Sequence, residues 1–231
     1  MDGRADVLAA IEADERLAAI HAEAAARMGA DPDPGHDLEH ALRVALWTVR
    51  LAEAEGGVDP AEAIAAALLH DVVNLPKNHP ERATASERSA DLARRLLPRH
   101  GFHDAATERV AEAIRDHSFS GGATPRTTLG RALQDADRLE ALGALGLCRT
   151  LSTGAKMGAV YAHPEDPFGE DRALDDRRYT VDHFYEKLLG LPQTLQTEAG
   201  RREAAKRTAF LEQFLVQLGE ELGVPARLTR S

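Results

Sequence analysis

The stretch Ala63–Ala83, AIAAALLHDVVNLPKNHPERA, starts as an apolar helical run and ends in His70-Asp71, followed by a loop with proline, asparagine and histidine. An Asp-Pro pair at residues 59–60 is a typical helix start, because aspartate caps the first turn and proline fits there without its missing N–H. The stretch therefore predicts a core helix with an imidazole and a carboxylate side by side at its C-terminal end. A helix suited to a core needs neither group, so each requires a partner.

The composition predicts an all-α fold. The chain of 231 residues is rich in alanine, leucine, glutamate and arginine, and only 4% of its residues are aromatic, which favours helices over a sandwich or barrel. Residues 154–180 lack a sustained period and predict a long loop, either functional or disordered. Apolar periodicity with glycine and proline stops predicts helices over about 5–29, 38–57, 60–71, 86–98, 104–122, 127–151, 181–190 and 199–222.

Charge and cysteine content limit the partners. A formal net charge of −10 disfavours nucleic acid, whose backbone needs a basic face. The N-terminus shows no signal peptide, and no apolar stretch reaches the about 18 residues of a membrane span. The single cysteine, Cys148, lies in an apolar run that predicts a small core residue, and without an export signal a cytoplasmic location is expected. A small anionic ligand and a homodimer remain open.

Three polar positions on separate predicted helices face apolar surface: His40, the His70-Asp71 pair and Asp137. Burying an imidazole or carboxylate without a partner costs several kcal/mol. Separate hydrogen bonds or caps are one explanation for each. A divalent metal is a single explanation for all four, because two nitrogens and two oxygens suit such an ion and leave positions open for water and substrate.

The segments HALRV from His40, ALLHD ending at Asp71 and QDADRLE around Asp137 resemble the ordered H…HD…D pattern of the HD-domain metal-dependent phosphohydrolase superfamily. The wider segments LLHDVVNLPKNHPER, HSFSGG, QDADRLEALGALGLCRT and VDHFYEKLLGLPQTLQTEAGRREAAKR are similar to a bacterial subgroup of predicted HD hydrolases or nucleotide pyrophosphohydrolases. The resemblance covers about residues 35–222.

The resemblance implies an all-α HD-domain helical bundle with additional C-terminal helices. It implies a single HD-type domain over 1–231, with the HD core at about 35–150 and a helical extension at about 151–222. The implied cofactor is a divalent metal, one of Mn, Mg, Ni, Co, Fe or Zn, and the implied ligands are His40, His70, Asp71 and Asp137.

Asp135 and Asp137 compete for the last ligand position. Two residues apart on a helix, their side chains point roughly 200° from each other, so both are not expected to bind one ion. In the family the aspartate of ADR is the ligand, which selects Asp137. Asp135 then either accepts a hydrogen bond beside the ligands or lies on the surface.

Two further histidines follow the pattern of HD enzymes that bind a second metal. His79 and His117 lie in order between the HD pair and Asp137. The alternatives are a solvated loop residue for His79 and, for His117, a cation at a helix C-terminus, where the helix dipole favours it.

Basic residues beside these positions are candidates for binding phosphate oxygens, although each alone can be an ordinary surface charge. Many HD nucleotide hydrolases carry a glutamate four residues after the dyad histidine, whereas this chain has Asn74, whose amide orients water but cannot take its proton. Asp71, Asn74 and His117 are therefore the catalytic candidates. The candidates for substrate binding are Arg43, Lys77, Arg82, Arg138, Lys156, His183 and Lys187.

The resemblance thus implies a metal-dependent phosphohydrolase that uses a metal-activated water on a nucleotide or another small phosphate ester. Two other classes stay open. One is a non-catalytic, metal-containing module that senses nucleotides, suggested by Asn74. The other is a di-iron HD oxygenase, favoured only if His79 and His117 complete a two-metal cluster.

Overall fold

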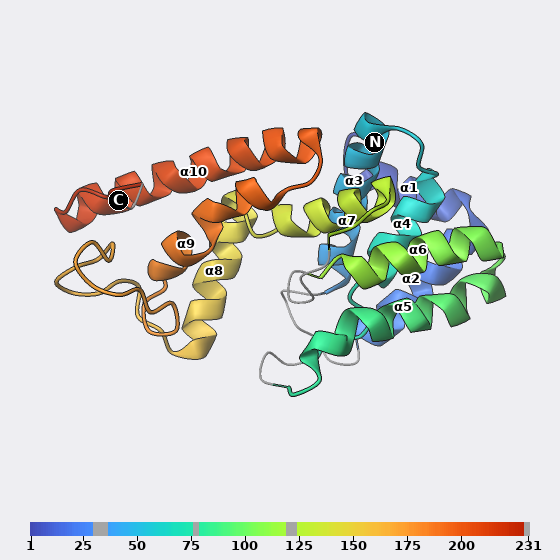
Figure 1. Ribbon diagram of the computed structural model, residues 1–231, viewed down its shortest axis with the longest axis horizontal. Helices are drawn as coiled ribbons and strands as arrows, with labels where there is room; N and C mark the ends of the chain where they lie inside the picture. Colours follow the sequence, from blue (N-terminus) through green and yellow to red (C-terminus); the bar gives the residue numbers. More distant parts are fainter. Residues whose placement is uncertain (30–36, 76–78, 119–123, 229–231) are drawn as a thin grey trace. The chain divides into compact units, whose positions relative to one another are not determined.

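The computed structural model describes residues 1–29, 37–75, 79–118 and 124–228, and its regular elements there are all helices (Figure 1). The predicted all-α fold is therefore confirmed. The chain forms two compact units, Met1–Asp137 and Arg138–Ser231. The single HD-type domain with its boundary near residue 150 stays a prediction.

The N-terminal segment forms two helices, α1 (Arg4–Ala13) and α2 (Glu15–Met28), so the prediction of one helix over 5–29 was wrong. The break is at Asp14, whose extended backbone ends α1 and whose carboxylate accepts the N–H of Arg16 at 2.9 Å. The Arg16 guanidinium also donates to the Asp14 carboxylate, at 2.6 Å. Asp14 is thus an N-cap, a role that overrides the helical periodicity on either side.

Replacing Asp14 by alanine is expected to destabilise the protein by about 1 kcal/mol, the usual contribution of an N-cap side chain. The hydrogen bond from the Arg16 side chain is the main cause that lowers the pKa of Asp14. The ionised Asp14 carboxylate therefore stabilises the folded protein above the ordinary pKa of aspartate, and this contribution is lost as the pH falls through the lowered pKa. Urea unfolding at neutral pH measures the effect. Asp14→Asn keeps a capping side chain and should lose less of the free energy of unfolding than Asp14→Ala. Equal losses in the two variants would contradict the capping role.

The next two helices form the centre of the first unit. Asp37 caps α3 (Leu38–Glu55) by accepting the N–H of His40 at 2.8 Å, and Asp59 caps α4 (Pro60–Leu69). All residues of α4 from Glu62 to Leu69 are buried, because α2, α3 and α6 pack around it. Its apolar sequence therefore matches its place in the core.

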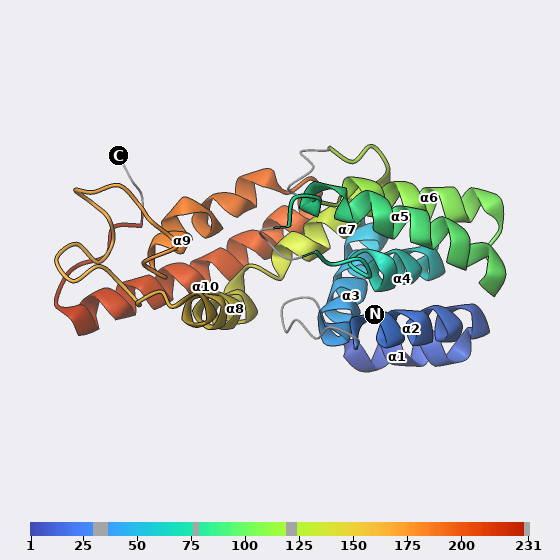
Figure 2. The ribbon, with the colours of Figure 1, turned by 90° about the horizontal axis from the view of Figure 1, so that it is seen from below.

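A helical hairpin completes one side of the first unit. The short helix η1 (Arg82–Thr84) leads into α5 (Ala85–Leu96), and η2 (Leu97–His100) turns the chain at Gly101 into α6 (Asp104–Asp116). Gly101 has a φ of 83°, a conformation that side chains with a Cβ disfavour. As a result α5 and α6 run side by side (Figures 1 and 2).

The prediction of one helix over 127–151 was wrong, because α7 (Thr128–Leu139) and α8 (Gly143–Met157) are separate. Gly143, the first residue of α8, has a φ of 71°, which lies outside the range of a continuous right-handed helix. A Cβ on Gly146 would lie 2.2 Å from the carbonyl oxygen of Ala141, so only glycine allows this close approach. Helix α7 thus ends two residues after the predicted ligand Asp137.

The second unit holds α8, α9 (Asp182–Glu186), η4 (Leu188–Thr194) and α10 (Glu198–Leu222), with α10 packed on α8 and η4 (Figure 2). The long loop spans 158–181 rather than 154–180, because α8 continues to Met157. Cys148 is exposed on α8, so its predicted place in a core was wrong. No helix in the described part of the chain is both long and apolar enough to cross a membrane.

Candidate metal centre

Two histidines cap the C-terminal ends of two buried helices in the same way. His70 follows α4 and its Nδ1 lies 2.7 Å from the carbonyl oxygen of Ala67, while His117 follows α6 with its Nδ1 2.6 Å from the carbonyl oxygen of Ile114. Carbonyls in a last helical turn lack intrahelical partners, and a carbonyl can only accept, so Nδ1 carries the proton. When the ring is neutral, each Nε2 therefore carries a lone pair that a ligand can use.

His40 and Asp137 bring two more helices to the same place. His40, in the first turn of α3, is fully buried, and its ring centroid lies 5.3 Å from that of His70. Asp137, near the end of α7, places an oxygen 3.5 Å from His40 Nε2. The first and last residues of the predicted motif therefore lie close together.

Asp71 lies between two of the histidines. One carboxylate oxygen is 3.4 Å from His70 Nε2, and the other is 3.5 Å from His117 Nε2. The rings of His70 and His117 are 5.0 Å apart, edge to face. The structure therefore brings His117 to the predicted metal ligands, although it is 46 residues further along the chain than Asp71.

These five side chains fit a divalent metal. Potential ligand atoms lie within 4.8 Å of one another in two groups, His40–His70–Asp137 and His70–Asp71–His117, which share His70. His70 Nε2 is buried and forms no hydrogen bond within the described residues, as expected of a nitrogen reserved for a ligand. The cluster can therefore hold a divalent ion, although its donor set does not specify which one.

The cluster is buried on one side and open on the other. His40 and His70 are fully buried and His117 is 5% exposed, whereas the Asp71 and Asp137 side chains are 21% and 31% exposed. The nitrogens therefore form the floor of the site and the carboxylates its rim.

Burial and mutual proximity shift the pKa values. Burial lowers the pKa of His70 to about 4, against the opposing effect of Asp71, so this imidazole is neutral at neutral pH, as a metal ligand must be. Burial also acts to lower the pKa of His117, but the Asp71 carboxylate outweighs it and the pKa is raised. For Asp137, burial opposes ionisation, yet His40 and His70 outweigh it and lower its pKa.

The other predicted residues around the HD pair have varied surroundings. Asp135 is fully buried on α7, so the surface alternative for it was wrong. His79 Nδ1 accepts the N–H of Glu81 at 3.1 Å, in a local turn, and is absent from both potential ligand groups of the described chain. Arg43 is half-buried on α3, and Asn74 is exposed in the loop after Asp71.

The remaining cations predicted to bind substrate differ in what the structure shows of them. Arg82 donates a hydrogen bond to the backbone carbonyl of Leu75. Lys77 lies outside the described residues. The other four lie in the second unit. Arg138 donates a hydrogen bond to the carbonyl of Thr194, and His183 Nδ1 is 2.8 Å from an Asp176 oxygen. Lys156 and Lys187 are exposed. Substrate binding by these residues stays a prediction.

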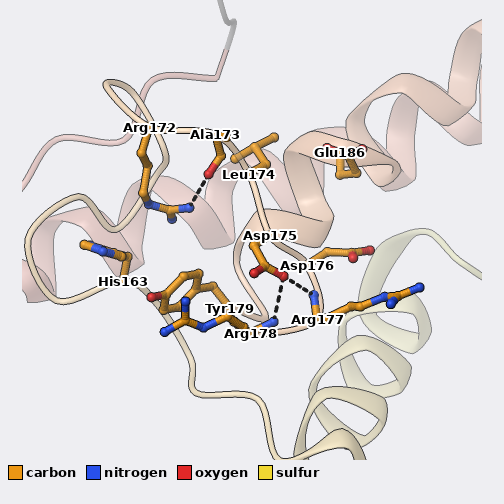
Figure 3. A pocket seen from close by; sticks show the side chains of 10 residues that line it. All are labelled: His163, Arg172, Ala173, Leu174, Asp175, Asp176, Arg177, Arg178, Tyr179 and Glu186. Carbon is orange, nitrogen blue, oxygen red and sulfur yellow. Dashed lines mark hydrogen bonds between the residues drawn. The ribbon is translucent and has the colours of Figure 1, made fainter.

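The second unit has its own cavity of about 470 Å³ beside the loop 158–181 (Figure 3). Asp182, fully buried, accepts two hydrogen bonds from the Arg172 guanidinium, at 2.5 and 2.6 Å, and one from the N–H of Asp175, at 2.7 Å. The Arg172 guanidinium also lies 4.7 Å from the centre of the Tyr179 ring. The arginines and carboxylates that line the cavity balance in charge, so its lining favours neither anions nor cations.

Sequence reasoning did not identify the Arg172–Asp182 pair or Ser89. Ser89 is fully buried on α5, and its Oγ accepts the N–H of Val73 in the loop after Asp71 at 3.1 Å. A signal for its burial exists, because it is in phase with the apolar Ala93 and Leu96 at i+4 and i+7. No comparable signal marks Arg172, which lies in an irregular loop.

Comparison with known proteins agrees with this geometry. The family model of the HD domain matches residues 37–142. The uncharacterized protein YpgQ of Bacillus subtilis (strain 168) is 30% identical over 197 residues, which cover 83% of this chain and 87% of YpgQ. The match therefore extends well beyond the metal-binding segment.

Two solved structures show the same fold. The crystal structure of Bacillus subtilis YpgQ in complex with ADP has a TM-score of 0.67 at 27% identity, covering 87% of this chain and 92% of that one. An HD-superfamily hydrolase from Bacillus thuringiensis has a TM-score of 0.68 at 30% identity, covering 94% and 98% of the two chains. Together with the His/Asp cluster, these matches show that the chain belongs to the HD-domain metal-dependent phosphohydrolase superfamily.

Proposed function

We propose that this protein hydrolyses a phosphate bond in a nucleotide or another small phosphate ester. The observation that carries the proposal is the cluster of three buried histidines and two half-buried carboxylates, whose ligand atoms lie within 4.8 Å of one another in two groups. Superfamily membership supports hydrolysis. The ADP in the YpgQ crystal structure supports a nucleotide as the substrate class.

We assign the metal to His40, His70, Asp71 and Asp137. A divalent ion in such a site supplies hydroxide at neutral pH and Lewis-acid polarisation of a phosphoryl oxygen. The protein orients the ligands: the Nδ1 hydrogen bond to Ala67 holds the His70 ring with Nε2 toward the site, and such outer hydrogen bonds also raise ligand basicity. The buried histidine floor excludes water from one face, which strengthens electrostatic interactions there.

His117 and Asn74 take roles that the ligands do not fill. The Asp71 carboxylate raises the pKa of His117, which enables His117 to hold a proton at Nε2 and to deliver it to a leaving oxygen. His117 can alternatively complete a second metal position, since its Nε2 lies in the second potential ligand group. Asn74 can orient a water by hydrogen bonding but cannot act as a base.

The test is a phosphate- and pyrophosphate-release screen over nucleotides, with Mn²⁺, Mg²⁺, Co²⁺ and Ni²⁺ each added to the metal-stripped protein. We expect release from at least one nucleotide, and we expect Asp137→Ala to reduce it by at least about 100-fold, because a metal ligand is lost. Asp91→Ala removes an exposed carboxylate on α5 and is the matched control.

Two results would redirect the assignment. Bound metal and bound ADP without release from any nucleotide would favour the sensor, and would contradict the hydrolase. About two iron ions per chain together with oxygen consumption would favour the di-iron oxygenase.

A further inference from the structure

Two side chains from the following segment hold the loop that comes after Asp71. Regular helix ends at Leu69, and one long backbone hydrogen bond, from the N–H of Val72 to the carbonyl of Leu69 at 3.5 Å, continues into the turn that carries Asp71. The N–H of Val73 donates to Ser89 Oγ at 3.1 Å, and the carbonyl of Leu75 accepts from the Arg82 guanidinium. Asp71 precedes the first of these two points of attachment, and Asn74 lies between them.

Ser89 is placed on α5 for this contact. Its side chain is fully buried on a helix face shared with Ala90, Ala93 and Leu96. A hydroxyl on such a face is unfavourable unless it is hydrogen-bonded. Val73 supplies that hydrogen bond, and Ser89 in turn satisfies a backbone donor in a segment without a regular ladder.

Arg82 makes the second attachment from η1. Its own N–H donates to the carbonyl of His79 at 3.1 Å, which fixes the turn that carries it. Its guanidinium then reaches back seven residues to Leu75. The hydrogen bond from Arg82 links Leu75 to η1, so this side chain already has a structural partner.

We infer that Ser89 and Arg82 are positioning residues for the metal centre, because they fix the backbone that orients Asp71. The Asp71 oxygens must lie between His70 and His117, at 3.4 and 3.5 Å from the two Nε2 atoms. A carboxylate at a helix end keeps that position only if the chain after it is held. The inference rests on the metal centre proposed above and gives Arg82 a role that requires no substrate.

The test is calorimetric titration of the metal-stripped full-length protein with Mn²⁺, without substrate. Ser89→Ala and Arg82→Met should each weaken Mn²⁺ binding by about tenfold, the lower end of the usual effect of removing a group that supports a metal ligand. Ser89→Thr keeps a hydroxyl and should recover at least part of the affinity. Ser86→Ala is the matched control, because Ser86 lies one turn earlier on α5 and is not the acceptor of the Val73 N–H.

Each failure has a distinct meaning. Unchanged Mn²⁺ affinity in Ser89→Ala would overturn its positioning role while leaving the metal centre intact. If Arg82→Met leaves Mn²⁺ affinity unchanged and raises only the KM of nucleotide hydrolysis, Arg82 binds substrate and its positioning role is overturned. An absence of Mn²⁺ binding by the unmodified protein would overturn the metal centre and this inference with it.

Discussion

Replacing Asp71 by alanine is expected to remove most of the bound metal. The two oxygens of Asp71 face two different histidines, at 3.4 Å from His70 and 3.5 Å from His117. Loss of groups that merely support a ligand costs about 10- to 100-fold in metal affinity. Loss of the Asp71 ligand should therefore lower metal affinity by more than about 100-fold, and the rate of hydrolysis should fall with it.

The measurement is elemental analysis after dialysis, followed by Mn²⁺ titration of the same sample. Because the Asp71 side chain is 21% exposed, its removal should leave helicity by circular dichroism nearly unchanged. The matched control is Asp91→Ala, which removes an exposed carboxylate from α5. Full metal content in the Asp71→Ala protein, or full hydrolysis in a metal-free one, would contradict the assignment.

Replacing Asp182 by alanine is expected to destabilise the second unit by about 3–5 kcal/mol, the usual cost of leaving a buried charge without its partner. The carboxylate is fully buried and accepts three hydrogen bonds, two from Arg172 and one from the N–H of Asp175. Its loss leaves the Arg172 guanidinium, 17% exposed, without its closest counter-charge. Arg172 also lines the cavity beside the loop 158–181 (Figure 3).

Urea unfolding monitored by circular dichroism measures this loss. The double variant Arg172→Met/Asp182→Ala removes both charges and should lose less than Asp182→Ala alone, because no charge is left unpaired. Arg202→Ala is the control within the same unit, since its ion pair with Glu198 is exposed and should contribute less than about 0.5 kcal/mol. If the double variant is no more stable than Asp182→Ala, the unpaired Arg172 charge is not the cause of the lost stability.

The sequence also led to the four proposed metal ligands, because each carries a local signal. His40 and Asp137 fall in phase with apolar neighbours, and His70-Asp71 ends an apolar helix. Those patterns predict where a polar group faces a core. The structure brings these residues together with His117, which the sequence included as a catalytic candidate and as one of two histidines suited to a second metal.

Other expectations depended on choices that periodicity does not encode. A helix over 5–29 is compatible with the apolar pattern, but the carboxylate of Asp14 caps a second helix instead. A helix over 127–151 is equally compatible, but Gly143 adopts a positive φ and ends it. A local interaction of one side chain or one dihedral angle outweighs a weak propensity summed over a turn.

The sequence by itself determined the all-α class, most helix positions and the polar groups that require partners. Only the tertiary structure decided which partner each group has: Ser89 with Val73, Asp182 with Arg172, and Asp71 with both His70 and His117. Hydrophobic periodicity reports which face of a helix is buried. The few ångströms between one side chain and another are set by how helices distant in sequence pack and where their ends meet.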